Sequence, residues 1–252
     1  MFIYRCDLTL QEATFFSSRE IGSLYGTEPL IGNYALAYAF GYAQSRYRND
    51  GGIMYKEDLG RLNEAGVYIT PASFFGSPRF LLRTFNAQTD GYWSAYGAGV
   101  VVGRTEFGWS ERRGQHWYTV EPDGTQRRHN PTNRPQEGRI RMLAAENRAC
   151  AYILSTSEIV IPRYIRLGKF MSKASVQSQR LAYEILDGGE QVITHLLNPA
   201  DLSSDSRMSI FDLVNVPPVP LVRNARLTGR LLKLEDGVFL PAAMRFGVEQ
   251  LP

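Results

Sequence analysis

The sequence predicts an α+β protein in which a β-sheet is layered with a small number of helices. Three observations lead to this fold class. Short runs rich in aromatic and β-branched residues recur along the chain, two or three stretches have helical character, and proline marks many of their ends. With 252 residues, of which 44% are hydrophobic and 21% charged, the chain can form one large packed domain.

The first third of the chain mixes strand and helix signals. Residues 2–10 alternate and predict an opening strand. Thr27-Glu28-Pro29 is a typical helix start, and residues 29–40 are apolar all round, so we expect a largely buried helix there. Residues 55–65 predict a second helix, and residues 67–71 predict a strand that ends at its proline.

The rest of the chain is mostly strand-like. Residues 78–96 are rich in aromatic side chains and predict strands, whereas residues 140–154 fit either a helix or a strand. Two strand-like runs, at residues 226–234 and 238–245, follow the last cluster of prolines. We therefore expect additional β-strands at the C-terminal end.

Residues 121–139 interrupt this pattern with a polar segment that carries three prolines and has no periodicity. Loops of this length inside a compact domain are usually functional or disordered. Because the chain has neither an internal repeat nor a clean linker, we expect one domain over residues 1–252, from which residues 121–139 project as an inserted hairpin or long loop.

The sequence also argues against several functional classes. No stretch approaches the roughly 20 apolar residues that span a bilayer, and the N-terminus lacks a signal-peptide pattern, so we expect a cytoplasmic protein with no membrane contact. Cys6 and Cys150 are expected to be small buried apolar residues. Because no metal-ligand spacing occurs and the glycine-rich residues 95–103 lack the helix of a dinucleotide site, we expect no metal and no cofactor.

The net charge of +3 is modest, so the placement of the charge is more informative than its sum. Between Glu158 and Glu184 the chain has no acidic residue but five cations, which are Arg163, Arg166, Lys169, Lys173 and Arg180. Cations neutralise phosphates while aromatic rings stack on bases. This window therefore favours nucleic-acid binding over the alternative, a solvated strand with protective charges.

Aromatic residues are interleaved with these cations. If residues 164–173 form one strand, alternate positions share a face, which would hold Tyr164, Arg166, Gly168, Phe170 and Ser172. A second basic cluster lies in the predicted insertion and contains Arg127, Arg128, His129 and Arg134. It fits a segment that contacts an RNA or DNA backbone and fits an ordinary solvated loop equally well.

Three residues of the chain could belong to a catalytic site. His116 and His129, with Tyr118 and a lysine, could in principle cleave RNA without a metal ion, because a general base can deprotonate the 2′-hydroxyl. No motif fixes these residues near one another, and no carboxylate pair, phosphate-binding loop or nucleophile motif is present. We therefore expect no catalytic residue.

Five blocks carry a family resemblance, and they are Ile3 to Cys6, Phe15 to Gly22, Thr27 to Tyr38, Leu62 to Ala72 and Tyr164 to Lys173. In this order they resemble the Cas-five-type subunit of type I-D CRISPR complexes, the Csc-one family of the RAMP superfamily. The resemblance extends to about residue 180 and is less distinct over the C-terminal 70 residues. It implies a ferredoxin-like (RRM-type) domain with an inserted hairpin or long loop.

The resemblance also implies a function. Such subunits bind the 5′ handle of the crRNA, cap the filament of backbone subunits, and contact the large subunit near the PAM of the target DNA, without catalysis of their own. The handle is a constant single strand, so its bases can be stacked and read at their edges. The candidate RNA-binding residues are Arg163, Tyr164, Arg166, Lys169, Phe170, Lys173, Arg19 and Tyr25.

Two other classes remain open from the sequence. One is a metal-independent endoribonuclease that processes crRNA, since some relatives of the capping subunit do so. The other is a structural protein whose basic window contacts an acidic partner. Cleavage of repeat RNA in EDTA would indicate the first, and assembly without RNA the second.

Overall fold

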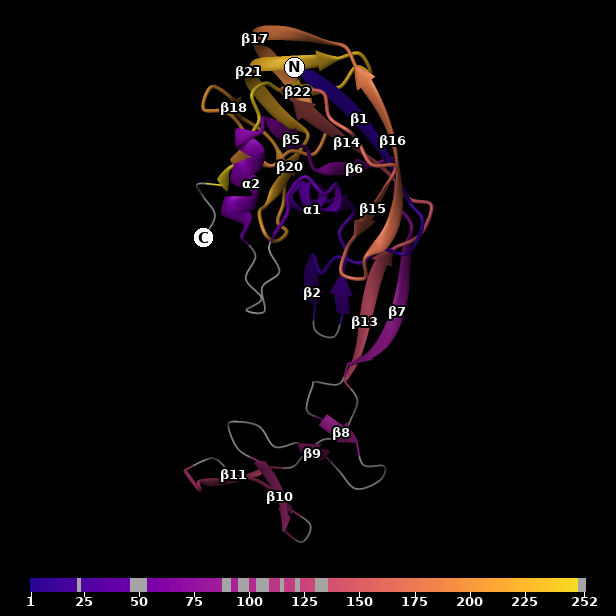
Figure 1. Ribbon diagram of the computed structural model, residues 1–252, viewed down its shortest axis with the longest axis vertical. Helices are drawn as coiled ribbons and strands as arrows, with labels where there is room; N and C mark the ends of the chain where they lie inside the picture. Colours follow the sequence, from indigo (N-terminus) through magenta and orange to yellow (C-terminus); the bar gives the residue numbers. More distant parts are fainter. Residues whose placement is uncertain are drawn as a thin grey trace. The chain divides into compact units, whose positions relative to one another are not determined.

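The computed structural model describes residues 1–21, 24–45, 54–87, 92–94, 100–102, 109–113, 116–120, 123–129 and 136–248. The chain divides into two compact units, one formed by Met1–Leu82 with Ile140–Pro252 and the other by Arg83–Arg139. Over the described residues the chain is mostly β with two α-helices (Figure 1). None of the helices in this part of the chain is long and apolar enough to cross a membrane.

The first unit is built on an antiparallel sheet of seven strands, in the order β15-β16-β1-β14-β6-β4, with β5 also paired to β14 (Figure 1). Its strands are β1 (Phe2–Leu10), β4 (Leu30–Ile31), β5 (Val67–Ile69), β6 (Ala72–Phe74), β14 (Arg148–Ser155), β15 (Tyr164–Leu167) and β16 (Ser172–Leu181). The central strand β1 pairs with β14 on one side and β16 on the other, so that Cys6 lies between Ala151 and Ser178. The predicted opening strand is confirmed.

The chain passes from β1 to β5 through α1 (Asn33–Ala39) and α2 (Tyr55–Glu64). β1 and β5 both pair antiparallel with β14, which lies between them, so they run parallel to each other. This is a split β-α-β arrangement. The helix predicted at residues 55–65 is confirmed, whereas the helix predicted at residues 29–40 begins only at Asn33, because Leu30 and Ile31 pair with β6 as a short strand.

A second sheet follows directly, since only Ala182 separates β16 from β17. It consists of β17 (Tyr183–Ile193), β18 (Arg207–Met208), β21 (Ala225–Leu234) and β22 (Phe239–Pro241), and β21 pairs with the other three. The two sheets share one core, in which Ile3 and Ile153 are buried together with Leu227 and Leu232. The strand predicted at residues 226–234 is confirmed, and the run predicted at 238–245 is the shorter β22.

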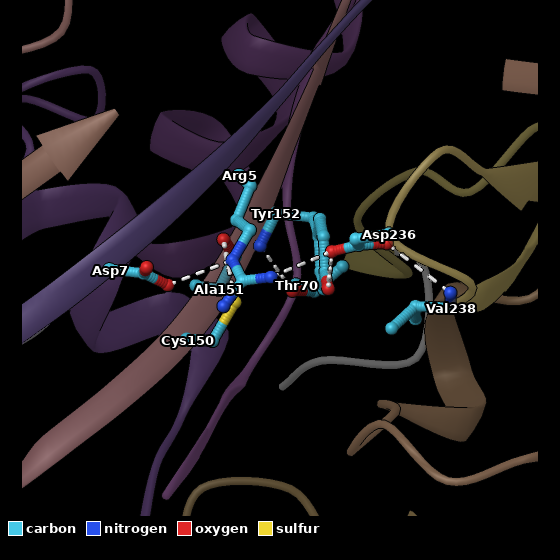
Figure 2. Close-up of polar contacts among 8 residues, drawn as sticks. All are labelled: Arg5, Asp7, Thr70, Cys150, Ala151, Tyr152, Asp236 and Val238. Atoms are coloured by element: carbon cyan, nitrogen blue, oxygen red, sulfur yellow. Dashed lines mark hydrogen bonds and ion pairs between the residues drawn. The ribbon is translucent and has the colours of Figure 1, made fainter. Parts of the chain in front are cut away.

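A polar cluster joins the central sheet to the turn between β21 and β22 (Figure 2). Arg5 donates a 3.0 Å hydrogen bond to Asp7 and a 3.2 Å hydrogen bond to Asp236. The Tyr152 hydroxyl donates to the same Asp236 carboxylate at 2.8 Å, and the Val238 backbone N–H donates to its other oxygen at 3.2 Å. Because each partly buried charge is hydrogen-bonded, the cluster can hold the C-terminal hairpin against β1 and β14 without unpaired polar groups.

Three smaller elements lie wholly or partly in the first unit. β2 (Arg19–Ile21), β3 (Leu24–Gly26), β13 (Gln136–Leu143) and β7 (Phe80–Ala87) form a sheet in that order, and β19 (Asp212–Val214) pairs with β20 (Leu221–Arg223). The 3₁₀ helix η1 covers Pro199–Asp201. Residues 140–154, which fitted a helix or a strand, are the end of β13 and β14.

Among its described residues the second unit has no helix, and it includes the later part of β7 and the first part of β13. β8 (Tyr92–Ser94) pairs with β9 (Val100–Val102), and β10 (Trp109–Arg113), β11 (His116–Val120) and β12 (Gln126–His129) form a three-stranded antiparallel sheet. The predicted insertion at residues 121–139 falls inside this unit, which begins earlier, at Arg83. Residues 121–122 and 130–135, and with them Arg134, lie outside the described residues.

Candidate nucleic-acid interface

The basic window folds as the β15–β16 hairpin at the edge of the central sheet. Arg166 lies directly opposite Lys173, and Tyr164 lies opposite Ser175. Along β15 the side chains alternate between exposed and buried, with Tyr164 and Arg166 exposed and Ile165 buried. The hairpin therefore presents an aromatic ring and cations on one face and anchors itself with the other.

Residues 164–173 do not form one continuous strand, which was the condition for the shared face described above. A turn separates β15 from β16, with Gly168 at φ +70° and Met171 at φ +52°. Consequently Phe170 belongs to the turn, and Ser172 lies opposite Leu167 on the buried side instead of sharing a face with Tyr164. The alternation was wrong beyond Leu167 because the local pattern does not reveal this turn.

The turn rests on the segment that follows β1. The backbone N–H of Lys169 donates to the Phe15 carbonyl at 2.9 Å. A Cβ atom on Gly168 would lie 2.5 Å from that same carbonyl oxygen, so only glycine allows this approach. The ring of Phe170 stacks on Phe15 with centroids 5.5 Å apart, yet 58% of Phe170 stays exposed. The fold thus fixes an accessible ring beside Lys169.

A carboxylate distant in sequence partly neutralises the window. Glu12 accepts a 3.0 Å hydrogen bond from the backbone N–H of Lys173 and lies 4.0 Å from the Arg166 guanidinium. Arg166 also donates to the Met171 carbonyl at 3.1 Å. The window has no acidic residue of its own, but Arg166 is thus partly compensated by a carboxylate from outside it, although exposed pairs of this kind are weak. Neither Arg163 nor Lys169 has an ion-pair partner within the part of the chain that the structure describes.

Arg19 and Tyr25 lie on the β2–β3 hairpin. Arg19 forms a 2.5 Å ion pair with Glu28, whose side chain is only 17% exposed, so its charge is held in place. Tyr25 lies opposite Glu20 in the register, and a hydrogen bond between their side chains raises the pKa of the Tyr25 hydroxyl. Both predicted residues are thus occupied in local pairs.

Two clefts of the first unit connect Lys169 with Arg19. Lys169 lines a pocket of about 330 Å³, and Arg19 lines a shallower cleft of about 550 Å³. Ser18 and Val216–Pro218 border both. The structure therefore brings two residues 150 positions apart to neighbouring clefts, which sequence patterns did not reveal. The segment Val216–Pro218, which borders both clefts, is marked in the sequence only by its cluster of prolines.

The second basic cluster lies on β12 of the second unit. Successive strand residues fall on opposite faces of a sheet, so Arg127 and His129 occupy one face and Arg128 the other. His129 lies directly opposite Trp117, so these two residues share a face. His116 precedes Trp117 on β11 and therefore lies on the other face. The backbone register therefore separates the two histidines that were considered as a catalytic pair.

The buried titratable groups are structural in character. His195 contacts the Thr70 hydroxyl and the Pro71 carbonyl at 2.9 and 3.0 Å, and burial lowers its pKa to about 4. Cys6 and Cys150 are buried free thiols, as predicted, and burial raises the pKa of Cys150 to about 12. Across the described residues, no three histidine, cysteine or carboxylate side chains are grouped so that they could hold a metal ion.

Comparison with known proteins places these features in a family. No curated protein matches the chain. A chain of the cryo-EM structure of the Type III-B Cmr-beta bound to cognate target RNA and AMPPnP is similar, with 10% identity, a TM-score of 0.43, and coverage of 89% of this chain and 86% of that one. The family of the Type I-D CRISPR-associated protein Cas5/Csc1 matches residues 1–249. The chain therefore belongs to the type I-D Cas5/Csc1 family of CRISPR-associated proteins.

Proposed function

We propose that this protein is a non-catalytic subunit of a type I-D CRISPR surveillance (Cascade) complex that binds the 5′ handle of the crRNA. In this role it caps the filament of backbone subunits and contacts the large subunit near the PAM of the target DNA. Family membership supports the type I-D assignment. The observation that carries RNA binding is the β15–β16 hairpin, where two exposed rings stand among cations.

The chemistry of the hairpin suits a single strand. Tyr164 and Phe170 are 57% and 58% exposed, and exposed aromatic rings are platforms for unstacked bases. The ammonium group of Lys173 lies over the Tyr164 ring, and Lys169 has no ion-pair partner among the described residues. Cations beside rings can neutralise phosphates of the same strand whose bases stack, and this combination is typical of proteins that bind single-stranded RNA.

For the fold, we propose that the first unit is the ferredoxin-like domain that the resemblance implies. The support is the strand order β16-β1-β14-β6 together with the split β-α-β connection through α1 and α2. A ferredoxin-like domain has a second helix before its last strand. In this chain β15 occupies the corresponding place in the sequence, between β14 and β16.

For the second unit, we propose that β12 contacts an RNA or DNA backbone through Arg127 and His129. Opposite these positions on β11 lie Thr119 and Trp117. Hydroxyl, aromatic and cationic residues that share one face of a sheet can contact both phosphates and bases. Arg128 falls on the other face, so its contribution should differ from that of Arg127.

The absence of catalysis is also part of the proposal. A ribonuclease without a metal ion needs a base and an acid at the same phosphodiester. His116 and His129 fall on opposite sheet faces, and His195 is buried and hydrogen-bonded inside the first unit. These placements support a binding role over crRNA processing.

The test is the salt dependence of binding to handle RNA. We expect the Arg166→Ala/Lys169→Ala variant to bind more weakly and to lower the slope of log K against log salt by about 0.7 per lost phosphate contact. The matched control is Arg230→Ala/Lys233→Ala on β21, which also removes one arginine and one lysine that are exposed. Equal slopes for both variants and the wild type would overturn the assignment of the hairpin as the RNA site.

A further inference from the structure

The pocket beside Lys169 is separate from the exposed rings of the hairpin. Its volume is about 330 Å³, and four segments enclose it: Phe16–Ser18, the start of α1 at Gly32–Ala35, Val216–Val219, and the hairpin turn at Lys169. Tyr38 and Tyr55 line it as well. Pockets of about 300 Å³ or more that are enclosed by apolar and aromatic groups are typical small-ligand sites.

The lining has a distinctive chemistry. Its surface is mainly apolar and aromatic, and the hydroxyls of Ser17 and Ser18 add a few polar groups. Lys169 is the only charged residue among the described residues that line it. The pocket therefore suits a flat group with apolar faces and polar edges that is attached to an anion.

We propose that this pocket receives one unstacked base of the bound RNA, with Lys169 on the phosphate next to that base. The inference rests on the proposed function and deepens it, because it names a base-binding site apart from the stacking surface of the hairpin. A base taken out of its stack is held by apolar and aromatic walls and by hydrogen bonds to its edge. The tyrosines and serines of this pocket provide both.

The surroundings give the strand a path into the pocket. Phe170, the neighbour of Lys169, is exposed and stacked on Phe15 on one side. The cleft lined by Arg19, whose guanidinium is paired with Glu28, shares Ser18 with the pocket. One base can thus enter the pocket beside a ring platform that suits the adjoining nucleotide.

An apolar side chain of a partner protein is a weaker fit. It would fill the apolar walls but would leave Lys169, which has no ion-pair partner among the described residues, without an anion. A nucleotide supplies the apolar group and the anion together.

The start of α1 offers a clean way to block the pocket. Gly32 precedes the helix at φ −65° and ψ 146°, a conformation open to any residue, and a Cβ atom there would meet nothing within 4 Å. Gly32→Phe should therefore fill the pocket without backbone strain, and Gly32→Ala is the matched control that leaves it open.

The experiment measures binding of the intact protein to handle RNAs in which single bases are removed in turn. In the wild type and in Gly32→Ala, loss of one particular base should weaken binding by about fivefold to 100-fold. In Gly32→Phe, intact RNA should bind more weakly by a similar factor, and removing that base should have no further effect, since both changes remove the same contact. Thermal unfolding checks that the variant is folded.

A second measurement needs no variant. 2-Aminopurine placed at the sensitive position should lose fluorescence on binding to the wild type, as for a base stacked against tyrosine.

The inference fails if removal of no single base weakens binding, or if removal of the base weakens binding to Gly32→Phe as much as to the wild type. The salt-slope test of the hairpin would still stand. Unchanged RNA binding by Gly32→Phe together with lost assembly of the partner subunits would identify a protein occupant and also overturn it. Failure of the wild type to bind handle RNA would overturn the proposed function itself.

Discussion

The ammonium nitrogen of Lys173 lies 4.1 Å from the centre of the Tyr164 ring, across the two strands of the β15–β16 hairpin. The two residues are diagonal neighbours, because Tyr164 is opposite Ser175 and Lys173 is opposite Arg166. A cation over one face holds the ring in position and leaves a base only the other face for stacking. The pair therefore leaves one face of the Tyr164 ring available to a base of single-stranded RNA.

The first prediction concerns this ring. Tyr164→Phe keeps the stacking surface and should bind handle RNA like the wild type. Tyr164→Ala should lose about 1–3 kcal/mol of binding free energy, the usual value of one stacked base. Stability should change little in either variant, since 57% of Tyr164 is exposed. Fluorescence anisotropy measures the affinities, and equal affinities for the two variants would show that no base stacks here.

The second prediction concerns the turn beneath the hairpin. Gly168→Ala forces a non-glycine residue to φ +70° and brings a Cβ atom to 2.5 Å from the Phe15 carbonyl oxygen. Gly76→Ala is the matched control, because Gly76 has φ +63° but open space around it. Gly76→Ala should lower the free energy of unfolding by about 1–2 kcal/mol through backbone strain alone. Gly168→Ala should lower it distinctly more, because it adds the clash with Phe15. Urea unfolding measures both; similar losses would mean that the contact with Phe15 relaxes freely.

The same turn shows where reading the sequence fails. Tyr164 to Leu167 alternates as a strand should, and this part of the predicted face is correct. The turn depends partly on Met171 at positive φ, a residue type that does not signal turns. Local pattern predicted β1 and α2 well because their periodicity is set by one buried face. The predicted helix starts too early compared with α1, because the apolar pair Leu30 and Ile31 suits a strand as well as a helix.

The candidate site was harder to predict than the elements. The cations of the window were visible, but their surroundings were not: Glu12 comes from the segment after β1, and the Val216–Pro218 wall of the pocket from the segment between β19 and β20. Contacts between residues so distant in sequence are decided by the packing of the whole sheet. Two candidate cations change their expected electrostatics as a result: Arg166 has a carboxylate 4.0 Å away, and Arg19 is paired with Glu28.

The third prediction concerns pH. The pKa of His195 is lowered to about 4 by burial, against about 6.5 for an unfolded chain, so the unfolded state binds more protons between these values. His195 thus contributes stability that is present above pH 6.5 and is lost as the pH falls toward 4. The loss amounts to about 3 kcal/mol at 1.4 kcal/mol per pKa unit. In His195→Gln this dependence should vanish, so the cost of the substitution should shrink as the pH falls.

The wild-type curve alone does not reveal this effect, because Asp201 acts with the opposite sign. Burial raises the pKa of Asp201 to about 7, so its contribution is lost as the pH rises from about 4 to 7. Urea unfolding of the wild type and His195→Gln at the same series of pH values isolates the histidine. A cost that is constant from pH 4.5 to 7.5 would contradict the prediction.

The last prediction decides between binding and catalysis. His116 and His129 should be dispensable, singly and together, because the register places them on opposite faces of the β10–β11–β12 sheet. Loss of a general base typically lowers a rate by about 10²–10⁴-fold, whereas loss of one phosphate contact among several weakens binding only slightly. We therefore expect His116→Ala/His129→Ala to assemble with mature crRNA and to support interference near the wild-type level. The measurements are crRNA length on a gel, interference in cells, and thermal unfolding as a control for folding. Unprocessed precursor RNA that accumulates with a normally folded variant would contradict the binding role and assign the chain to the ribonucleases.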